Sequence, residues 1–180
     1  PRSPLQWAGD RLPGSTMEVT EVTLPPDSRR GLSPMAKLTR SVTINAPVED
    51  AFDHALNLGT FWTCSPEVAV RDVELTPDGV GTHATIWTHG LGVHFQGHME
   101  YTEVTRPERI VAQVVFGPEK PVWVFSFEPD DGGTKLTGEG EWHVSAPAVG
   151  KALEEWMAKS HTGFLETLLD NFKAQVEAAA

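Results

Sequence analysis

The sequence has little cysteine, little positive charge and no long apolar run. Cys64 is the single cysteine among 180 residues, which excludes an internal disulfide and speaks against a secreted disulfide scaffold. Lys and Arg number 14 against 25 Asp and Glu, giving a formal net charge of −11. Because nucleic acids and anionic membranes are bound mainly by Lys and Arg, we expect neither as a partner.

No apolar run approaches the roughly 18 residues that a spanning helix needs, so we expect no stable insertion into a membrane. Residues 1–34 also lack the cationic start followed by an apolar stretch that marks a secretory signal. We therefore expect a cytoplasmic protein.

Composition divides the chain into two parts. Residues 1–34 hold six Pro, three Gly and four Ser, with Trp7 as the single aromatic residue. Such a segment buries too little apolar surface to offset the entropy cost of ordering, so we expect a flexible N-terminal tail or extension. Residues 35–180 form the predicted folded domain.

Within that domain the first elements are a strand, a helix and a helical turn. Residues 38–45 alternate, with Leu38, Arg40, Val42 and Ile44 on one face. Pro47 near the first turn of a helix, followed by two acidic residues, predicts a helix start, and Asn57 and Gly59 predict its end. A short helical turn is expected through Trp62.

The middle of the chain predicts six strands joined by short turns, over residues 68–75, 82–88, 93–104, 109–116, 122–127 and 134–144. The last segment, residues 149–177, contains no Pro and places Leu153, Met157, Phe164 and Leu168 on one helical stripe. These elements predict an α+β fold in which a curved antiparallel sheet of seven strands wraps around a long C-terminal helix.

Five short stretches, in the right order, resemble the START/Bet v 1-like superfamily, specifically its bacterial polyketide cyclase/dehydrase-type members. They are residues 45–52 (NAPVEDAF), Phe61-Trp62 followed by Pro66, residues 80–82 (VGT), residues 103–111 (EVTRPERIV) and residues 131–137 (DGGTKLT). The resemblance covers about residues 37–178. It implies the helix-grip fold, with two short helices after the first strand and an apolar cavity between the sheet and the last helix.

The function that this resemblance implies is the binding of a hydrophobic small molecule, such as a lipid, a polyketide or an aromatic metabolite. Burial of apolar ligand surface would supply most of the affinity. A plain packed core is the alternative for the same side chains. The predicted ligand-binding residues are Trp62, Phe95, Met99, Tyr101, Trp123, Phe125, Trp142, Trp156, Met157, Ser160, His161, Phe164 and Leu168.

Two glycines, Gly138 and Gly140, fall on the inward face of the last strand, where they either leave space or let the strand bend. Ser160, His161, Asn171 and Thr88 are the polar groups that we expect to orient a guest.

Two other functions remain open. In a polyketide cyclase or aromatase-dehydratase of this fold, His161 is the candidate for acid–base catalysis. In a protein-interaction or stress-related module, an exposed apolar patch near Trp62 and Leu91 would meet the partner. The sequence predicts a monomer or a homodimer and requires no cofactor.

A third group of residues, the histidines, suggests a metal site only weakly. His94, His98 and Glu100 alternate on one strand, and a loop over residues 89–92 would place His83 opposite His98 and Trp87 opposite His94. Because this face is polar, we expect a solvated outer surface of the sheet and no bound metal. Cys64 has no basic neighbour, which predicts an inert thiol.

Overall fold

The computed structural model describes residues 35–90, 93–116, 120–143 and 150–179. Strand β1 (Met35–Ile44) is followed by the short helices α1 (Val48–Leu56) and α2 (Leu58–Trp62). Six further strands follow: β2 (Val68–Glu74), β3 (His83–Gly90), β4 (Val93–Thr105), β5 (Arg109–Val115), β6 (Val122–Asp130) and β7 (Gly133–His143). Helix α3 (Gly150–Ala179) ends the described chain. The predicted order of elements is confirmed, whereas the proposed tail, residues 1–34, lies outside the described residues.

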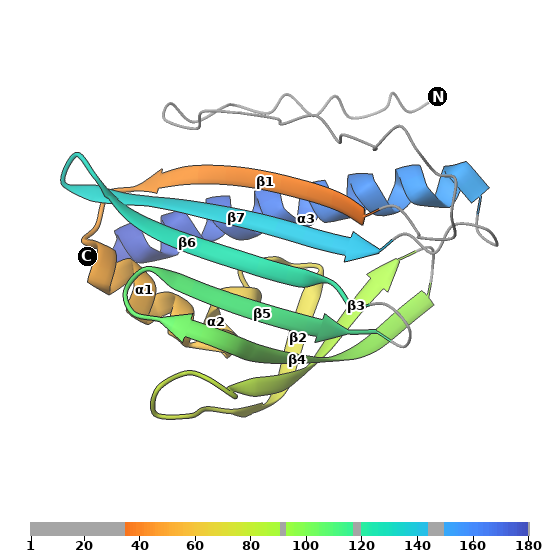
Figure 1. Cartoon of the computed structure of the whole chain (residues 1–180), viewed down its shortest axis with the longest axis horizontal. Coiled ribbons are helices and arrows are strands. Elements are labelled where there is room, and N and C mark those ends of the chain that lie inside the picture. Colours follow the sequence, from red (N-terminus) through yellow and green to blue (C-terminus); the bar gives the residue numbers. More distant parts are fainter. Residues whose placement is uncertain (1–34, 91–92, 117–119, 144–149, 180) are drawn as a thin grey trace, which may run out of the picture.

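The seven strands form one antiparallel sheet in the order β1-β7-β6-β5-β4-β3-β2. Figure 1 shows α3 behind this sheet, running along β1 and β7, while α1 and α2 lie behind the strands farther from β1. This arrangement is the predicted helix-grip fold.

The core lies between the inner face of the sheet and the helices. Alternation along the strands turns every second residue inward, and the strand residues buried there are mostly large and apolar. In α3, residues at helical spacing complete the core: Phe164, Leu165, Leu168, Leu169, Phe172 and Val176.

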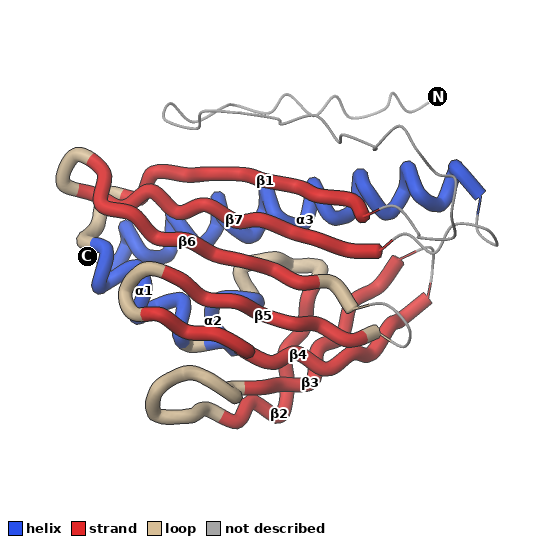
Figure 2. Tube along the Cα trace, in the orientation of Figure 1, coloured by secondary structure: helices blue, strands red, loops and turns tan. Residues whose placement is uncertain are grey.

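The turn between β6 and β7 is shorter than the sequence predicts. The sequence predicts strands that end at residue 127 and begin again at residue 134, but β6 continues through Pro129, which pairs with Thr134. Only Asp131 and Gly132 remain as the turn, both with positive φ (42° and 86°), as an Asp-Gly hairpin allows. Figure 2 shows this tight connection.

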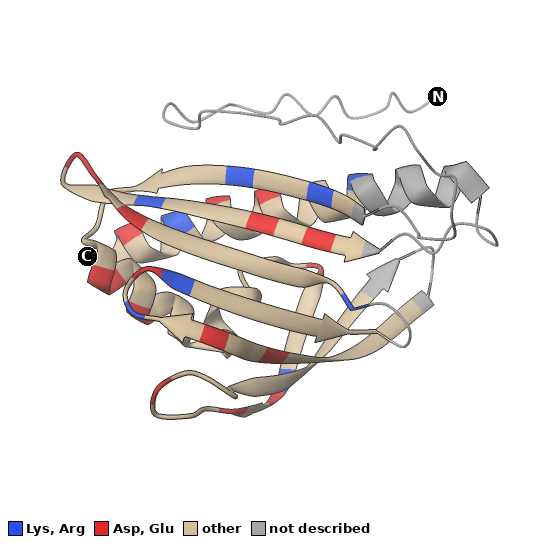
Figure 3. Ribbon diagram, in the orientation of Figure 1, with Lys and Arg blue, Asp and Glu red and all other residues tan. Residues whose placement is uncertain are grey.

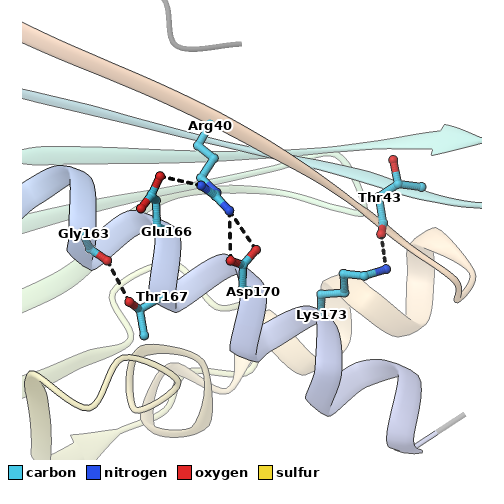
Figure 4. A network of polar contacts seen from close by, with 7 residues as sticks. All are labelled: Arg40, Thr43, Gly163, Glu166, Thr167, Asp170 and Lys173. Atoms are coloured by element: carbon cyan, nitrogen blue, oxygen red, sulfur yellow. Dashed lines mark hydrogen bonds and ion pairs between the residues drawn. The ribbon is translucent and has the colours of Figure 1, made fainter. Parts of the chain in front are cut away.

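A polar seam joins α3 to β1 at the edge of the sheet. Arg40, on the inner face of β1, pairs with Glu166 (2.8 Å) and Asp170 (2.9 Å) of α3. Lys173 donates to the carbonyl oxygen of Thr43. Figure 4 shows these contacts from close by. Because both oxygens of Asp170 accept from Arg40, the seam fixes the position of the helix along β1.

Charge is otherwise spread over the molecule. Figure 3 shows acidic and basic residues on strands, helices and loops alike. In the described part of the chain, no helix is long and apolar enough to cross a membrane.

Glu177 at the end of α3 makes stability depend on pH. Burial alone would raise its pKa, but hydrogen bonds from Lys173 (2.6 Å) and from the Asn45 N–H (2.7 Å), with the charge of Lys173, outweigh burial and hold the pKa below 4.5. A lowered folded-state pKa stabilises the fold above the unfolded-state pKa, and this contribution is lost as pH falls through the folded-state value.

We expect Glu177→Gln to lower the free energy of unfolding at pH 7 by up to about 1 kcal/mol. The difference from the wild type should shrink as pH falls below about 4. Urea midpoints at pH 7, 5 and 3.5 measure this. Glu108→Gln, which changes an exposed carboxylate in the β4–β5 turn, is the control. A Glu177→Gln deficit that stayed constant with pH would contradict the assignment.

Candidate functional site

Four aromatic side chains from three elements meet on the inner face of the sheet. Trp62 of α2 stacks on Phe164 of α3, with ring centroids 5.7 Å apart and an interplanar angle of 23°. Trp123 and Phe125 of β6 meet Trp62 edge to face, at 6.4 Å and 5.9 Å. Trp62 thus bridges the sheet and the long helix, which is the location predicted for the ligand-binding residues.

A second group lies beside it, where β6 begins and β7 ends. His161 of α3 stacks on Trp142 at 4.3 Å and 25°, and lies 5.8 Å from Trp123. His161 is only half-buried. The imidazole is therefore held against two indole rings at the rim of the core.

The same end of the sheet carries further inner-face aromatics. The strand register brings the start of β4 and the end of β5 to this end, with the start of β6 and the end of β7. Phe95 is 42% exposed, and Phe116 is half-buried with its ring over Gly97. We call Phe95, Phe116, Trp123, Trp142 and His161 the aromatic end.

A buried polar group, the Tyr101 hydroxyl, lies near the indole of Trp62. The Tyr101 hydroxyl donates to the carbonyl oxygen of Ala55 (2.9 Å). Burial raises the pKa of Tyr101, and the neighbouring N–H of Trp62 lowers it by a smaller amount. With its proton committed to Ala55 and a raised pKa, Tyr101 is poorly suited to acid catalysis at neutral pH.

The two inward glycines of β7 do not provide open space for a guest. A Cβ atom on Gly140 would lie 2.6 Å from the Trp123 ring, and one on Gly138 would lie 2.8 Å from a methyl carbon of Leu165. The space is filled by these two side chains. The glycines allow close packing against β7. Of the two expectations for them, the one that they leave open space is therefore wrong.

The predicted ligand-binding residues fall into three groups. Fully or nearly buried in the core are Trp62, Met99, Tyr101, Trp123, Phe125, Trp142, Phe164 and Leu168. At the rim are Ser160 and His161, both half-buried, and Phe95, which is exposed. The backbones of Trp156 and Met157 belong to α3, but their side chains lie outside the described residues, so their roles stay predictions.

The other polar candidate residues contact neighbouring segments of the chain. Asn171 donates to the carbonyl oxygen of Cys64 (2.7 Å), which ties α3 to the turn after α2. Cys64 donates to the Gln175 side chain (3.0 Å), and burial raises its pKa to about 11, which fits the predicted inert thiol. Thr88 is half-buried and pairs with Phe95.

Arg40 has no role that the sequence predicts, although alternation along the strand places it on the same face as Val42 and Ile44. Its position on the inner face is explained by the acidic residues of α3 that pair with it. The sequence signal for this ion pairing was the spacing of Glu166 and Asp170, which lie four residues apart and therefore on one face of the helix.

The histidine face is solvated, as predicted, but its register is not the predicted one. His94, Gln96, His98 and Glu100 are all exposed. Gly90 pairs with Val93, so the loop has two residues instead of four. His83 therefore pairs with Glu100, and Trp87 with Gln96. Among the residues described here, no three His, Cys, Asp or Glu side chains come together as metal ligands.

Comparison with known families decides the classification. A family model described as "Polyketide cyclase / dehydrase and lipid transport" matches residues 35–177. The chain belongs to this family. A search of curated proteins finds no match.

Solved structures agree on the fold. TTHA0849 from Thermus thermophilus is 20% identical with a TM-score of 0.64, over 80% of this chain and 99% of its own. StfQ, a di-domain ARO/CYC from the steffimycin biosynthetic pathway, is 14% identical with a TM-score of 0.66, over 81% of this chain and 52% of its own. Ara h 8.0201 is 14% identical with a TM-score of 0.57, over 80% of this chain and 99% of its own.

Gly140 offers a direct test of the packing at this site. Gly140→Ala places a methyl group against the Trp123 ring, and we expect a loss of about 1–3 kcal/mol in the free energy of unfolding. Gly163→Ala in α3 is the matched control, because a Cβ there meets nothing within 4 Å. That control should stabilise the protein by about 0.5–1 kcal/mol. Urea denaturation measures both, and equal effects of the two substitutions would contradict the packing described.

Proposed function

We propose that this protein binds a hydrophobic small molecule, such as a lipid, a polyketide or an aromatic metabolite, against the aromatic end of the sheet. The observation that carries the proposal is the partial exposure of inner-face aromatics there. Phe95, Phe116 and His161 continue the apolar inner face beyond the point where the core is closed by Trp62 and Phe164.

Membership of the family supports the same function, because the description of its model names both lipid transport and polyketide chemistry. The hydrophobic effect would drive this binding. A guest that covers Phe95 and the rim of Trp142 removes apolar surface from water, worth about 25 cal/mol per Å². Flat aromatic rings at the rim favour a guest that can stack on them.

A second candidate function is cyclisation or dehydration of a bound polyketide. It is favoured by the position of His161, a titratable side chain held by two indole rings where the proposed guest lies. The similarity to StfQ concerns the fold, so this chemistry is a proposal of its own. It requires a proton-transfer group beside the guest, and His161 is the described residue that fits.

The interaction-module alternative loses part of its predicted patch. Trp62 is 2% exposed and cannot contribute to an apolar surface, and Leu91 lies outside the described residues. Exposed apolar residues on the β2 side of the sheet, Val73, Leu75 and Val80, would be the remaining basis for a partner.

Phe95→Glu tests the proposed site without disturbing the core, because the side chain is already 42% exposed. A carboxylate at this position would lose hydration when an apolar guest covers it. We expect binding of N-phenyl-1-naphthylamine, a neutral probe whose fluorescence rises in apolar surroundings, to weaken by about tenfold or more.

Leu75→Glu is the matched control, because Leu75 is 60% exposed and follows edge strand β2. It should bind the probe as the wild type does. Circular dichroism confirms that both variants fold. Equal affinity of the two variants would contradict the location of the site.

A further inference from the structure

The two edges of the sheet differ in how well they are protected against pairing with a further strand. Edge strand β2 is interrupted, because its register with β3 shifts between Arg71 and Glu74, and Asp72 between them has a φ of 52°. A bulge with exposed charged side chains is a common way to keep an edge from pairing. At the opposite edge, β1 pairs with β7 without a shift over all of Met35–Ile44. Strand β1 is therefore the edge that can accept another strand.

Contacts near the end of β1 show which of its backbone groups face the free edge. The Thr43 carbonyl oxygen accepts from Lys173 of α3, whereas the Ile44 carbonyl oxygen lies against Gly133 of β7. The N–H and C=O of one residue point to the same side of a strand, and successive residues alternate. The odd-numbered residues of β1 therefore turn their backbone groups to the free edge.

The side chains of α3 reach only the last part of this edge, at Thr43 and just beyond β1 at Asn45, whose N–H donates to Glu177 (2.7 Å). Nearer the start of β1, each odd-numbered residue presents one N–H and one C=O to the edge. Within the described chain, β7 is the one strand that pairs with β1. A regular row of such groups is a template for a further strand.

One segment that precedes β1 has the composition of a strand. Residues 17–24 (MEVTEVTL) contain no Pro or Gly, although residues 1–34 as a whole hold six Pro and three Gly. Half of the segment is Val or Thr, the β-branched residues that favour strands. A flexible tail is expected from the average composition of residues 1–34, which this segment does not share.

The link between the segment and β1 favours pairing within one chain. Residues 25–34 contain three Pro and one Gly, and they need to span only the roughly 4.8 Å between neighbouring strands to return the chain antiparallel to β1. A short link holds the segment at an effective concentration on the order of 1 mM. A second copy of the chain at about 10 µM would compete at a disadvantage of about a hundredfold.

We propose that residues 17–24 dock on the free edge of β1 as an additional antiparallel strand. The partner of this edge is then the N-terminal segment of the same chain, and the backbone groups through which copies could associate are covered. This proposal is independent of the proposed ligand binding.

Amide hydrogen exchange of the ¹⁵N-labelled full chain, followed by NMR, tests the docking. The variant V19P/T20P places proline at two neighbouring positions. One of the two faces β1 in any register, and proline lacks the N–H that the ladder needs. We expect the amides of Lys37, Thr39 and Ser41 to exchange at least about tenfold more slowly in the wild type than in this variant, because a paired amide exchanges only when the strand opens.

The matched control is D10P/R11P, which lies in residues 1–34 but outside the segment and removes one charge of each sign. It should keep the exchange of the wild type. The amides of Leu38 and Arg40 face β7 and should stay protected in all three proteins, which shows that the domain is folded. In the wild type, cross-strand NOEs between residues 17–24 and β1 are expected.

Each other outcome overturns the proposal. Rapid exchange of the Lys37, Thr39 and Ser41 amides in the wild type would mean that the edge is open to water. Protection that survives in V19P/T20P would mean that another strand covers the edge. If that protection increases with protein concentration, the covering strand belongs to a second copy of the chain.

Discussion

One long helix has to cover the apolar face of a seven-stranded sheet, and the rest of the structure follows from how it does so. A sheet that is apolar on one face must bury that face, and an amphipathic helix must bury one stripe. Helix α3 places its stripe on the sheet and aligns along β1. Arg40 of β1 pairs there with Glu166 of α3, and Lys173 of α3 donates to the carbonyl oxygen of Thr43 in β1. Helices α1 and α2 then cover the part of the inner face that α3 does not reach. Trp62 of α2 is buried against Phe164 of α3.

This division of the inner face separates a closed core from an open rim. Toward α1 and the C-terminal end of α3, the rings of Phe61, Phe125 and Phe172 pack edge to face at 4.7–4.8 Å. At the aromatic end, Phe95 and His161 keep part of their surface exposed. The family to which the chain belongs joins lipid transport with polyketide chemistry, and both need an apolar surface that a guest can reach.

Much of the fold could be predicted from the sequence, because alternation and turn residues are local signals. The predicted strand 109–116 and helix 149–177 correspond to β5 and α3 within two residues at each end. The predicted register of the β3–β4 hairpin was wrong. It depends on whether the loop has two residues or four, and the sequence allows Gly90 to lie in the strand or in the loop. The packing against Gly138 and Gly140 could not be predicted from the sequence either, since only the fold shows which side chain fills the space above a glycine.

The candidate site was predictable in part. The predicted ligand-binding residues included Trp123, Phe125 and Trp142, and all three are buried. That Phe95 remains exposed on the same face as Met99 depends on how far the helices extend over the sheet, which no local pattern encodes.

The most direct test of the central claim is a crystal structure of the protein grown with saturating N-phenyl-1-naphthylamine. We expect the naphthalene ring on the inner face, in contact with Phe95 and Trp142, with α3 still held to β1 by Arg40. A guest bound on the outer face beside Trp87, or an inner face that stays closed and empty at saturation, would contradict it.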